Sequence, residues 1–307
     1  MQTPMPSNAS RNAAEAASGF APENDTPTGI LLVSFGLTTR QSKRTLRFCE
    51  QDVRRNFPGY PLRWAFTSRR YAGKTPHFAR KAQSIAGALS GFAAEGVTRI
   101  AVQPLHLVPG AEHTSLAAHL DTARKAYPAM TLVLGKPLVA DEASLPDIVT
   151  AMREATPRMG MPGEAFLWVG HGSTGRHAWY EALAAHVLDR NVPGIAPMFM
   201  GCLTGRPCVR ETLGILRRAG IQRLCLSPFF AFAGNHAAAD MGGKARHSWQ
   251  TRLEAAGISC RVNQCSLAET EAFLAIWRSR LCEALASLNA VADTHSECRD
   301  SSTPHKP

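Results

Sequence analysis

The stretch ILLVSFG at residues 30–36 is a continuous apolar run that ends in a glycine. A short run of this kind, closed by a turn residue, predicts a buried β-strand that leads directly into a tight loop. The same pattern returns in the second half of the chain as FLWVGHG at residues 166–172. This recurrence indicates that the chain contains the same structural unit twice.

A second pair of matching stretches supports the duplication. VTRIAVQP at residues 97–104 is similar to IQRLCLSP at residues 221–228, and both continue through an apolar segment to a glycine. Two residues beyond that glycine, the first half has Glu112 where the second half has His236. The duplication therefore pairs two candidate metal ligands.

Short β-rich runs alternate with longer amphipathic runs along the chain. The predicted strands cover residues 30–35, 62–67, 97–107, 166–169, 196–200 and 223–230, and the predicted helices cover residues 42–56, 76–91, 177–189, 207–219 and 268–285. Alternation of strands and helices favours parallel α/β units. We therefore predict an α/β fold of two duplicated lobes, each a parallel sheet flanked by helices, with a cleft between them.

The composition separates a core from two polar ends. Residues 1–28 and 289–307 are polar and contain Pro and Ser, so we expect disordered tails there. Between them we place an N-terminal lobe at 29–142 and a C-terminal lobe, with the final helix, at 143–288. A length of 307 residues with 45% hydrophobic residues fits two domains and excludes disordered and fibrous proteins.

Charge and hydropathy narrow the range of partners. The net charge is +10, but it is dispersed and no basic run is interleaved with aromatic residues. Nothing in this pattern favours nucleic acid, and a small polyanion accounts for the charge equally well. The longest apolar stretches fall short of the ~20 residues that span a bilayer. Because the N-terminus also lacks the marks of a secretory signal, we expect a cytoplasmic protein whose eight cysteines stay reduced.

Two histidines stand where predicted strands end. His171 lies between two glycines on a strand-to-loop turn, and His236 follows an apolar strand among small residues that leave room for a planar ligand. A neutral imidazole binds divalent cobalt, nickel, iron or zinc and also accepts a proton near neutral pH. Structural alternatives remain: His171 as a hydrogen-bonded turn residue, and His236 as a helix-start residue whose ring Asp240 could orient.

Glu112 follows a Pro-Gly break after another predicted strand. Ligands of open parallel sheets bind at the carboxyl ends of strands, so Glu112, His171 and His236 are expected to face one cleft. The alternative for Glu112 is a solvated loop acid. His106, which is flanked by leucines, is expected to lie in the core.

These residues resemble the anaerobic cobalt chelatases, which insert cobalt into sirohydrochlorin in cobalamin biosynthesis and belong to the wider class II chelatases. The resemblance covers residues 29–285 and rests on LLVSFG (31–36), AFTS (65–68), QPLH (103–106) leading to GAE (110–112), GHG (170–172), AGNH (233–236) leading to DM (240–241), and SW (248–249) leading to AAGI (255–258). It implies a bilobal chelatase fold with a tetrapyrrole in the cleft. It also implies that His171 and His236 are the pair that binds the metal and accepts protons.

The chain departs from the family pattern at one position. The family resembled here carries Gly-x-x-Glu-x-x-Pro between the two histidines, whereas this chain has GCLTGRP at residues 201–207, so Thr204 replaces the glutamate. A neutral hydroxyl is a weak ligand for a divalent cation, so metal affinity or metal choice should change. Glu112 could supply the anionic ligand instead, and Cys202 could add a thiolate if it faces the cleft.

The resemblance also gives the basic residues a role, because sirohydrochlorin carries eight carboxylates. Cationic residues in or beside the loops expected to rim the cleft are Arg69, Arg70, Lys74, Arg176, Arg206, Lys244 and Arg246. Guanidinium groups bind carboxylates in a forked geometry. We assign Arg69, Arg176, Arg206 and the nearby His177 to tetrapyrrole binding, with a solvated basic surface as the alternative.

The leading hypothesis is an ATP-independent chelatase that inserts divalent cobalt into sirohydrochlorin, with His171, His236 and Glu112 as catalytic and metal-binding residues. No Gly-x-x-x-x-Gly-Lys-Ser/Thr motif occurs, and neither a nucleotide nor a permanent cofactor is expected. The alternatives are a non-catalytic tetrapyrrole or metal carrier and a chelatase that uses iron or nickel. The expected partner is a sirohydrochlorin-type tetrapyrrole, without nucleic acid or membrane, and a homo-oligomer is left open.

Overall fold

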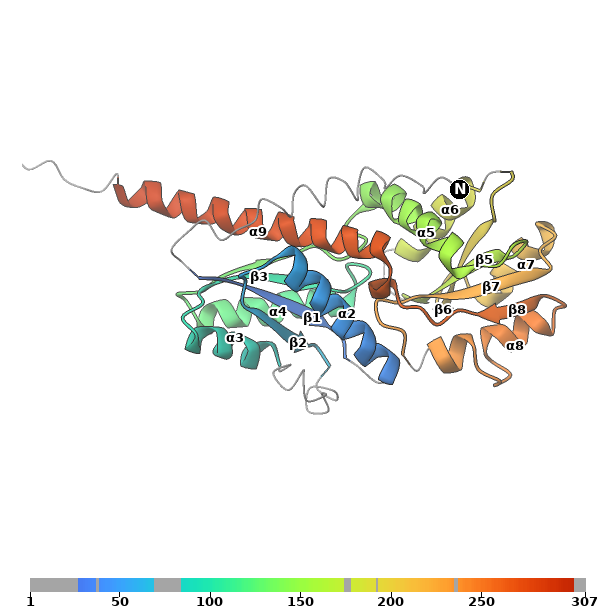
Figure 1. Cartoon of the computed structure of the whole chain (residues 1–307), viewed down its shortest axis with the longest axis horizontal. Coiled ribbons are helices and arrows are strands. Elements are labelled where there is room, and N and C mark those ends of the chain that lie inside the picture. Colours follow the sequence, from blue (N-terminus) through green and yellow to red (C-terminus); the bar gives the residue numbers. More distant parts are fainter. Residues whose placement is uncertain are drawn as a thin grey trace, which may run out of the picture.

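The computed structural model describes residues 27–36, 39–68, 84–173, 178–191, 193–234 and 237–300. Each half of the chain forms a four-stranded parallel sheet (Figure 1). The order is β2-β1-β3-β4 in the first sheet and β6-β5-β7-β8 in the second, so every strand has a counterpart in the other sheet. The strands are β1 (Thr28–Ser34), β2 (Leu62–Phe66), β3 (Arg99–Pro104), β4 (Thr131–Leu134), β5 (Ala165–Gly172), β6 (Met198–Thr204), β7 (Arg223–Phe229) and β8 (Ser259–Val262).

The predicted duplication of a parallel α/β unit is confirmed by these two sheets. The apolar run at residues 30–36 forms β1, the fully buried second strand of its sheet, and the matching run at 166–172 forms β5. Sequence analysis did not predict β4 and β8. Both have four residues and are mostly half-buried, so their apolar signal is weak.

Helices cover both faces of the sheets. They are α2 (Arg40–Asn56), α3 (Ile85–Ala94), α4 (Ala111–Ala126), α5 (Leu145–Met159), α6 (Trp179–Asp189), α7 (Val209–Arg218), α8 (Trp249–Glu254) and α9 (Glu271–Asp300), with short helices η2 (Glu142–Ser144), η3 (Ala237–Met241) and η4 (Leu267–Glu269). The first part of the helix predicted at 76–91 lies outside the described residues, which resume at Ser84, the N-cap of α3.

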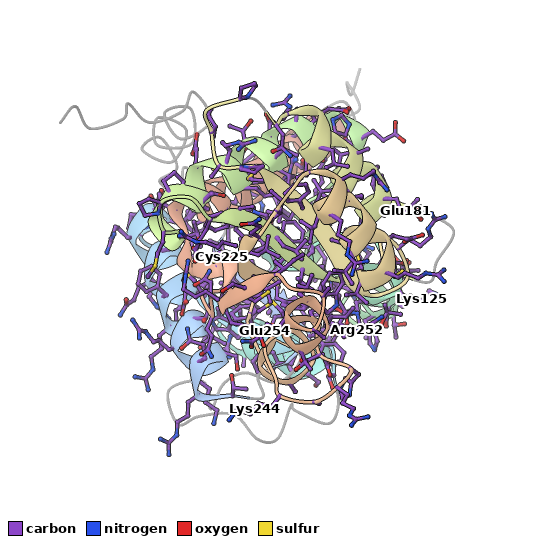
Figure 2. All side chains as sticks on the ribbon, turned by 90° about the vertical axis from the view of Figure 1, so that its right-hand side faces the viewer. Lys125, Glu181, Cys225, Lys244, Arg252 and Glu254 are labelled. Carbon is purple, nitrogen blue, oxygen red and sulfur yellow. The ribbon has the colours of Figure 1, made fainter. Side chains whose placement is uncertain are left out.

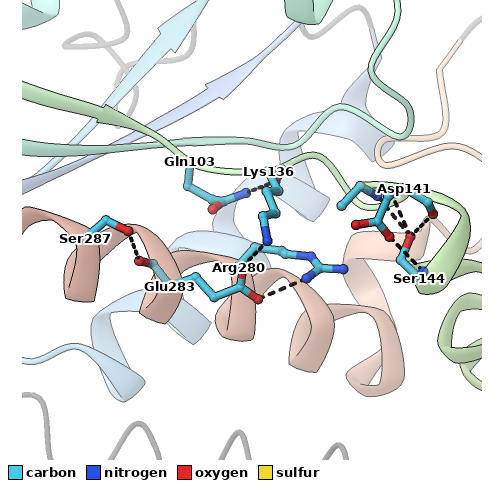
Figure 3. Close-up of polar contacts among 8 residues, drawn as sticks. Gln103, Lys136, Asp141, Ser144, Arg280, Glu283 and Ser287 are labelled. Carbon is cyan, nitrogen blue, oxygen red and sulfur yellow. Dashed lines mark hydrogen bonds and ion pairs between the residues drawn. The ribbon is translucent and has the colours of Figure 1, made fainter.

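The last helix, α9, follows the second lobe along the chain but packs against β3 and β4 of the first sheet (Figure 1). Glu283 of α9 pairs with Lys136 at 2.9 Å and with Arg280 at 2.9 Å, as the close-up in Figure 3 shows. The helix continues to Asp300, past the predicted end at residue 285. No Gly or Pro interrupts residues 286–300, so nothing in the sequence stops the helix there.

One apolar cluster joins the two lobes. It contains Leu32 and Trp64 from the first sheet, Phe166 and Trp168 from the second, and Phe273 from α9. One smaller apolar cluster lies on the outer face of each sheet. Glu181, Lys244 and Arg252, which are labelled in Figure 2 in the view onto the second lobe, are exposed.

Hydrogen bonds and ring contacts also tie the lobes together near the carboxyl ends of the strands. The Oγ1 of Thr39, just before α2, donates to the carbonyl oxygen of Ala233 at 3.4 Å. The ring of Trp64, in the middle of β2, lies 6.4 Å from that of Phe232, in the loop after β7. The segments that follow β1 and β7 therefore meet, at the carboxyl ends of strands where ligands bind in open parallel sheets.

Candidate functional site

His171 lies at the end of β5, where the strand emerges from the core. The six residues before it are buried, whereas His171 itself is exposed. The next residue, Gly172, has φ +84°, and a Cβ at this position would collide with the carbonyl oxygen of Thr204. Only glycine fits both the left-handed backbone and the close approach of β6. The glycine turn predicted from the sequence therefore presents His171 at the surface between the lobes.

Tyr180, in the first turn of α6, holds this turn from behind. Its ring is buried and packs so closely against Gly170 that a Cβ there would collide with it. Its hydroxyl oxygen accepts a hydrogen bond from the backbone N–H of Gly172. Its ring also meets Phe229 of β7 edge to face at 6.5 Å. Tyr180 thus contacts the backbone on both sides of His171, a role that sequence analysis did not identify.

Glu112 lies in the first turn of α4, which begins shortly after β3 ends. Its side chain is half-exposed, yet partial burial raises the pKa of its carboxyl group. Burial also raises the pKa of Tyr180, and the charges of Cys202 and Glu112 raise it further. The charge of Glu112, in the first lobe, thus acts on the Tyr180 hydroxyl of the second lobe.

Two further imidazoles lie beside Glu112. His106 is buried, as predicted, and its Nε2 is 3.9 Å from the nearest Glu112 oxygen. Neither of its ring nitrogens has a hydrogen-bond partner within the described part of the chain. Burial, and secondarily His113, lowers the pKa of His106 to about 4, so its ring is neutral at neutral pH. The His113 ring lies 6.1 Å away, edge to face. The motif HLVPGAEH at residues 106–113 is the sequence signal for this cluster.

Several predicted site residues lie outside the described residues. They are Arg69, Arg176, His177 and His236. The chain on either side of His236 is described, since β7 ends at Phe229 and η3 begins at Ala237. Asp240, predicted to orient His236, has its Oδ1 at 3.6 Å from Nε2 of His247.

The last residue of β6 carries the departure from the family motif. Thr204 is exposed and pairs in register with Gly172, next to His171. Cys202 is only 1% exposed, and burial raises the pKa of its thiol to about 12. It is therefore a protonated core residue in this structure and not a thiolate at the cleft.

Arg206 lies on the outer side of this loop. Its Nε is 2.8 Å from a carboxylate oxygen of Glu211 and 3.9 Å from one of Glu181. These residues border a cavity of about 580 Å³ between α6 and α7. The Arg206 guanidinium thus already has two carboxylate partners.

The described residues alone do not complete a metal site. Among them, no three His, Cys, Asp or Glu side chains lie together in an arrangement that could hold a metal ion. No helix in this part of the chain is long and apolar enough to cross a membrane. The seven cysteines whose side chains are described form no disulfide with one another.

The chain is similar in sequence to several known proteins. The family described as "Cobalt chelatase (CbiK)" matches residues 28–286. "Sirohydrochlorin cobaltochelatase CbiKC" of Nitratidesulfovibrio vulgaris Hildenborough is 35% identical over 267 residues, which cover 86% of this chain and 93% of the relative. "Sirohydrochlorin cobaltochelatase" of Salmonella typhimurium LT2 is 28% identical over 264 residues, 83% of this chain and 96% of the relative.

Solved structures share the fold at low sequence identity. SirB from Bacillus subtilis with Fe3+ is 18% identical, with a TM-score of 0.62 over 86% of this chain and 98% of that chain. The sirohydrochlorin chelatase SirB from Bacillus subtilis subspecies spizizenii in complex with cobalt is 16% identical, with a TM-score of 0.58 over 84% and 95%. The two-sheet architecture is therefore that of the chelatases.

Proposed function

The chain belongs to the cobalt chelatase (CbiK) family, and on this premise we propose that it inserts divalent cobalt into sirohydrochlorin in anaerobic cobalamin biosynthesis. The observation that carries the proposal is the exposed His171 on a rigid glycine turn at the end of β5. We propose that the reaction uses no nucleotide, because the sequence has no Gly-x-x-x-x-Gly-Lys-Ser/Thr motif. We place it in the cytoplasm, where cysteines stay reduced.

The reaction replaces two pyrrole N–H protons of the macrocycle with one divalent metal ion and releases both protons. We propose that His171 and His236 bind the incoming ion and accept these protons, since a neutral imidazole can do either. The Glu112 carboxylate, whose pKa is raised by burial, is a second group suited to take up a proton. Which imidazole acts as base is left open.

Glu112 also compensates for the family glutamate, which Thr204 replaces in this chain. A divalent ion held by two neutral imidazoles alone keeps its full charge, and a carboxylate offsets part of that charge. Thr204 offers only a neutral hydroxyl beside Gly172, whereas the charge of Glu112, in the other lobe, acts on Tyr180 next to this turn. We propose that Glu112 is the anionic ligand in this chain.

The eight carboxylates of the substrate need cationic side chains as partners at the rim of the cleft. We propose that Arg69, Arg176 and His177, from the loops after β2 and β5, bind them. Arg206 and Glu211 are already paired. Arg206 therefore contributes only if its guanidinium leaves Glu211 and binds a substrate carboxylate.

The decisive experiment follows cobalt insertion through the change in the sirohydrochlorin absorption spectrum. We expect His171→Ala to lower the insertion rate by roughly 100-fold or more, the usual effect of removing a general base. His119→Ala is the matched control, because His119 is an exposed histidine on α4 whose ring bonds only to Ser115 in its own helix. Full cobalt insertion by the His171→Ala protein would refute the proposal.

A second candidate function is a non-catalytic tetrapyrrole or metal carrier, which the Thr204 substitution favours. A carrier binds sirohydrochlorin and metal in stoichiometric amounts. The amount of metal-containing product therefore never exceeds the amount of protein. The same assay with excess substrate separates the two functions. Competition among cobalt, iron and nickel in that assay identifies the preferred ion.

A further inference from the structure

The duplication of the fold gives His171 a counterpart in the first lobe. β1 and β5 occupy the same place in their sheets, and ILLVSFG at residues 30–36 aligns with FLWVGHG at residues 166–172. Phe35 therefore stands where the second lobe has His171, and a glycine follows each of them. One lobe presents an imidazole at this position and the other presents a phenyl ring.

Phe35 is unusually exposed for an aromatic residue that follows a buried strand. All seven residues of β1 are buried, whereas Phe35 is 49% exposed. Leaving an aromatic ring in water forgoes the hydrophobic stabilisation that its burial provides. An exposed large apolar side chain at a candidate site therefore indicates a ligand that covers it.

Backbone contacts place Phe35 at the meeting point of the lobes. Its carbonyl oxygen accepts a hydrogen bond from the N–H of Ser68, in the loop after β2, at 3.0 Å. Four residues later, the Oγ1 of Thr39 donates to the Ala233 carbonyl in the loop that leads to residue 236. The β1–α2 loop is thus fixed between the loops that follow β2 and β7.

We propose that Phe35 forms an apolar wall of the cleft, against which one face of the flat tetrapyrrole ring rests. This inference builds on the proposed function and adds a residue that contacts the organic substrate and not the metal. An aromatic ring packs against the face of another planar π-system and excludes water from it. Phe35 would thereby set the position of the macrocycle relative to His171 on the other lobe.

The test measures binding of sirohydrochlorin without metal, by titration of its absorption, and then the KM values for both substrates. We expect Phe35→Ala to weaken sirohydrochlorin binding roughly tenfold, the loss expected when a ring contact worth about 1.5 kcal/mol is removed. The KM for cobalt should stay unchanged, and Phe35→Tyr should restore binding because it keeps the ring.

The matched control is Phe48→Ala. Phe48 is 48% exposed, nearly the same as Phe35, but it lies in the middle of α2 and not at a strand end. Phe48→Ala should leave sirohydrochlorin binding unchanged. Sirohydrochlorin binding by Phe35→Ala within twofold of the parent protein, or an equal loss in Phe48→Ala, would overturn the inference. If Phe35→Ala proves unstable, Phe35→Leu, which keeps apolar bulk without a planar ring, should show the same weakened binding.

This design separates the inference from the proposed function. A parent protein that binds sirohydrochlorin but inserts no cobalt contradicts the proposed activity, and the Phe35 contact can still be measured. A parent protein that inserts cobalt, together with a Phe35→Ala protein that binds normally, contradicts the Phe35 inference alone. A parent protein that does not bind sirohydrochlorin contradicts both.

Discussion

At the scale of single residues, the candidate site depends on glycines as much as on its imidazole. Gly170 leaves room for the Tyr180 ring, and Gly172 lets the turn after His171 approach the backbone of β6. Tyr180 then fixes this turn through the Gly172 N–H. The exposed histidine is therefore held in place by its own backbone.

Gly172→Ala tests this arrangement. The new Cβ would meet the Thr204 carbonyl in a backbone with φ +84°, so the turn must shift and carry His171 with it. We expect cobalt insertion to fall at least tenfold, since small misplacements of a catalytic group are costly. The insertion rate and the unfolding midpoint should be measured on the same preparation.

Gly220→Ala is the control for backbone strain alone. Gly220 also has a left-handed backbone, with φ +66°, but a Cβ there meets nothing within 4 Å. It should cost about 1–2 kcal/mol of stability and leave the insertion rate unchanged. Equal loss of activity in both variants would mean that strain, and not the collision beside His171, explains the effect.

At the scale of elements, α9 and α2 hold the first lobe together through one buried ion pair. Arg278 of α9 lies 2.7 Å from Asp52 of α2, and both side chains are buried. Arg278 also contacts Glu271. Burial raises the pKa of Asp52, and the charge of Arg278 opposes this rise. Arg278 thus supplies the counter-charge of a buried carboxyl group between two helices.

Removing one partner of this pair should be severe. We expect Arg278→Ala to lower the free energy of unfolding by about 3–5 kcal/mol, because it leaves Asp52 buried without its counter-charge. Urea unfolding, followed by tryptophan fluorescence, measures the change. Lys136→Ala, in the segment after β4, is the matched control: its ion pair with Glu283 of α9 is exposed and should contribute at most about 1 kcal/mol. A similar small loss for both variants would show that the buried pair is not needed.

At the scale of the whole molecule, the two lobes share a single apolar cluster. The Phe273 ring of α9 lies 6.1 Å from Trp168 and 6.2 Å from Phe229 of the second lobe. The same helix packs against β3 and β4 of the first lobe. The helix therefore connects both lobes. Unfolding of one lobe would expose apolar core residues of the other.

We expect the lobes to unfold together in one transition, although proteins of this size often show several. Phe273→Ala should lower the unfolding midpoint by an amount equivalent to about 3–5 kcal/mol without splitting the transition. Calorimetry and far-UV circular dichroism provide the measurement. Two separate transitions in the parent protein would contradict this expectation.

The amino-acid sequence was sufficient for the strands at the centre of each sheet. Residues 30–34 and 166–170 are buried without interruption, so their apolar signal is local and strong. The glycine turns, the duplication and the chelatase family also follow from local motifs, and the family is confirmed. The roles of His236, Arg69, Arg176 and His177 stay predictions.

Tertiary structure alone decided which distant residues meet. It placed α9 on the first sheet, Tyr180 behind the His171 turn, and His106 beside Glu112. It also buried Cys202 away from the cleft and paired Arg206 with Glu211. These contacts depend on how helices pack on the sheets, and packing between residues far apart in the chain leaves no periodic signal in the sequence.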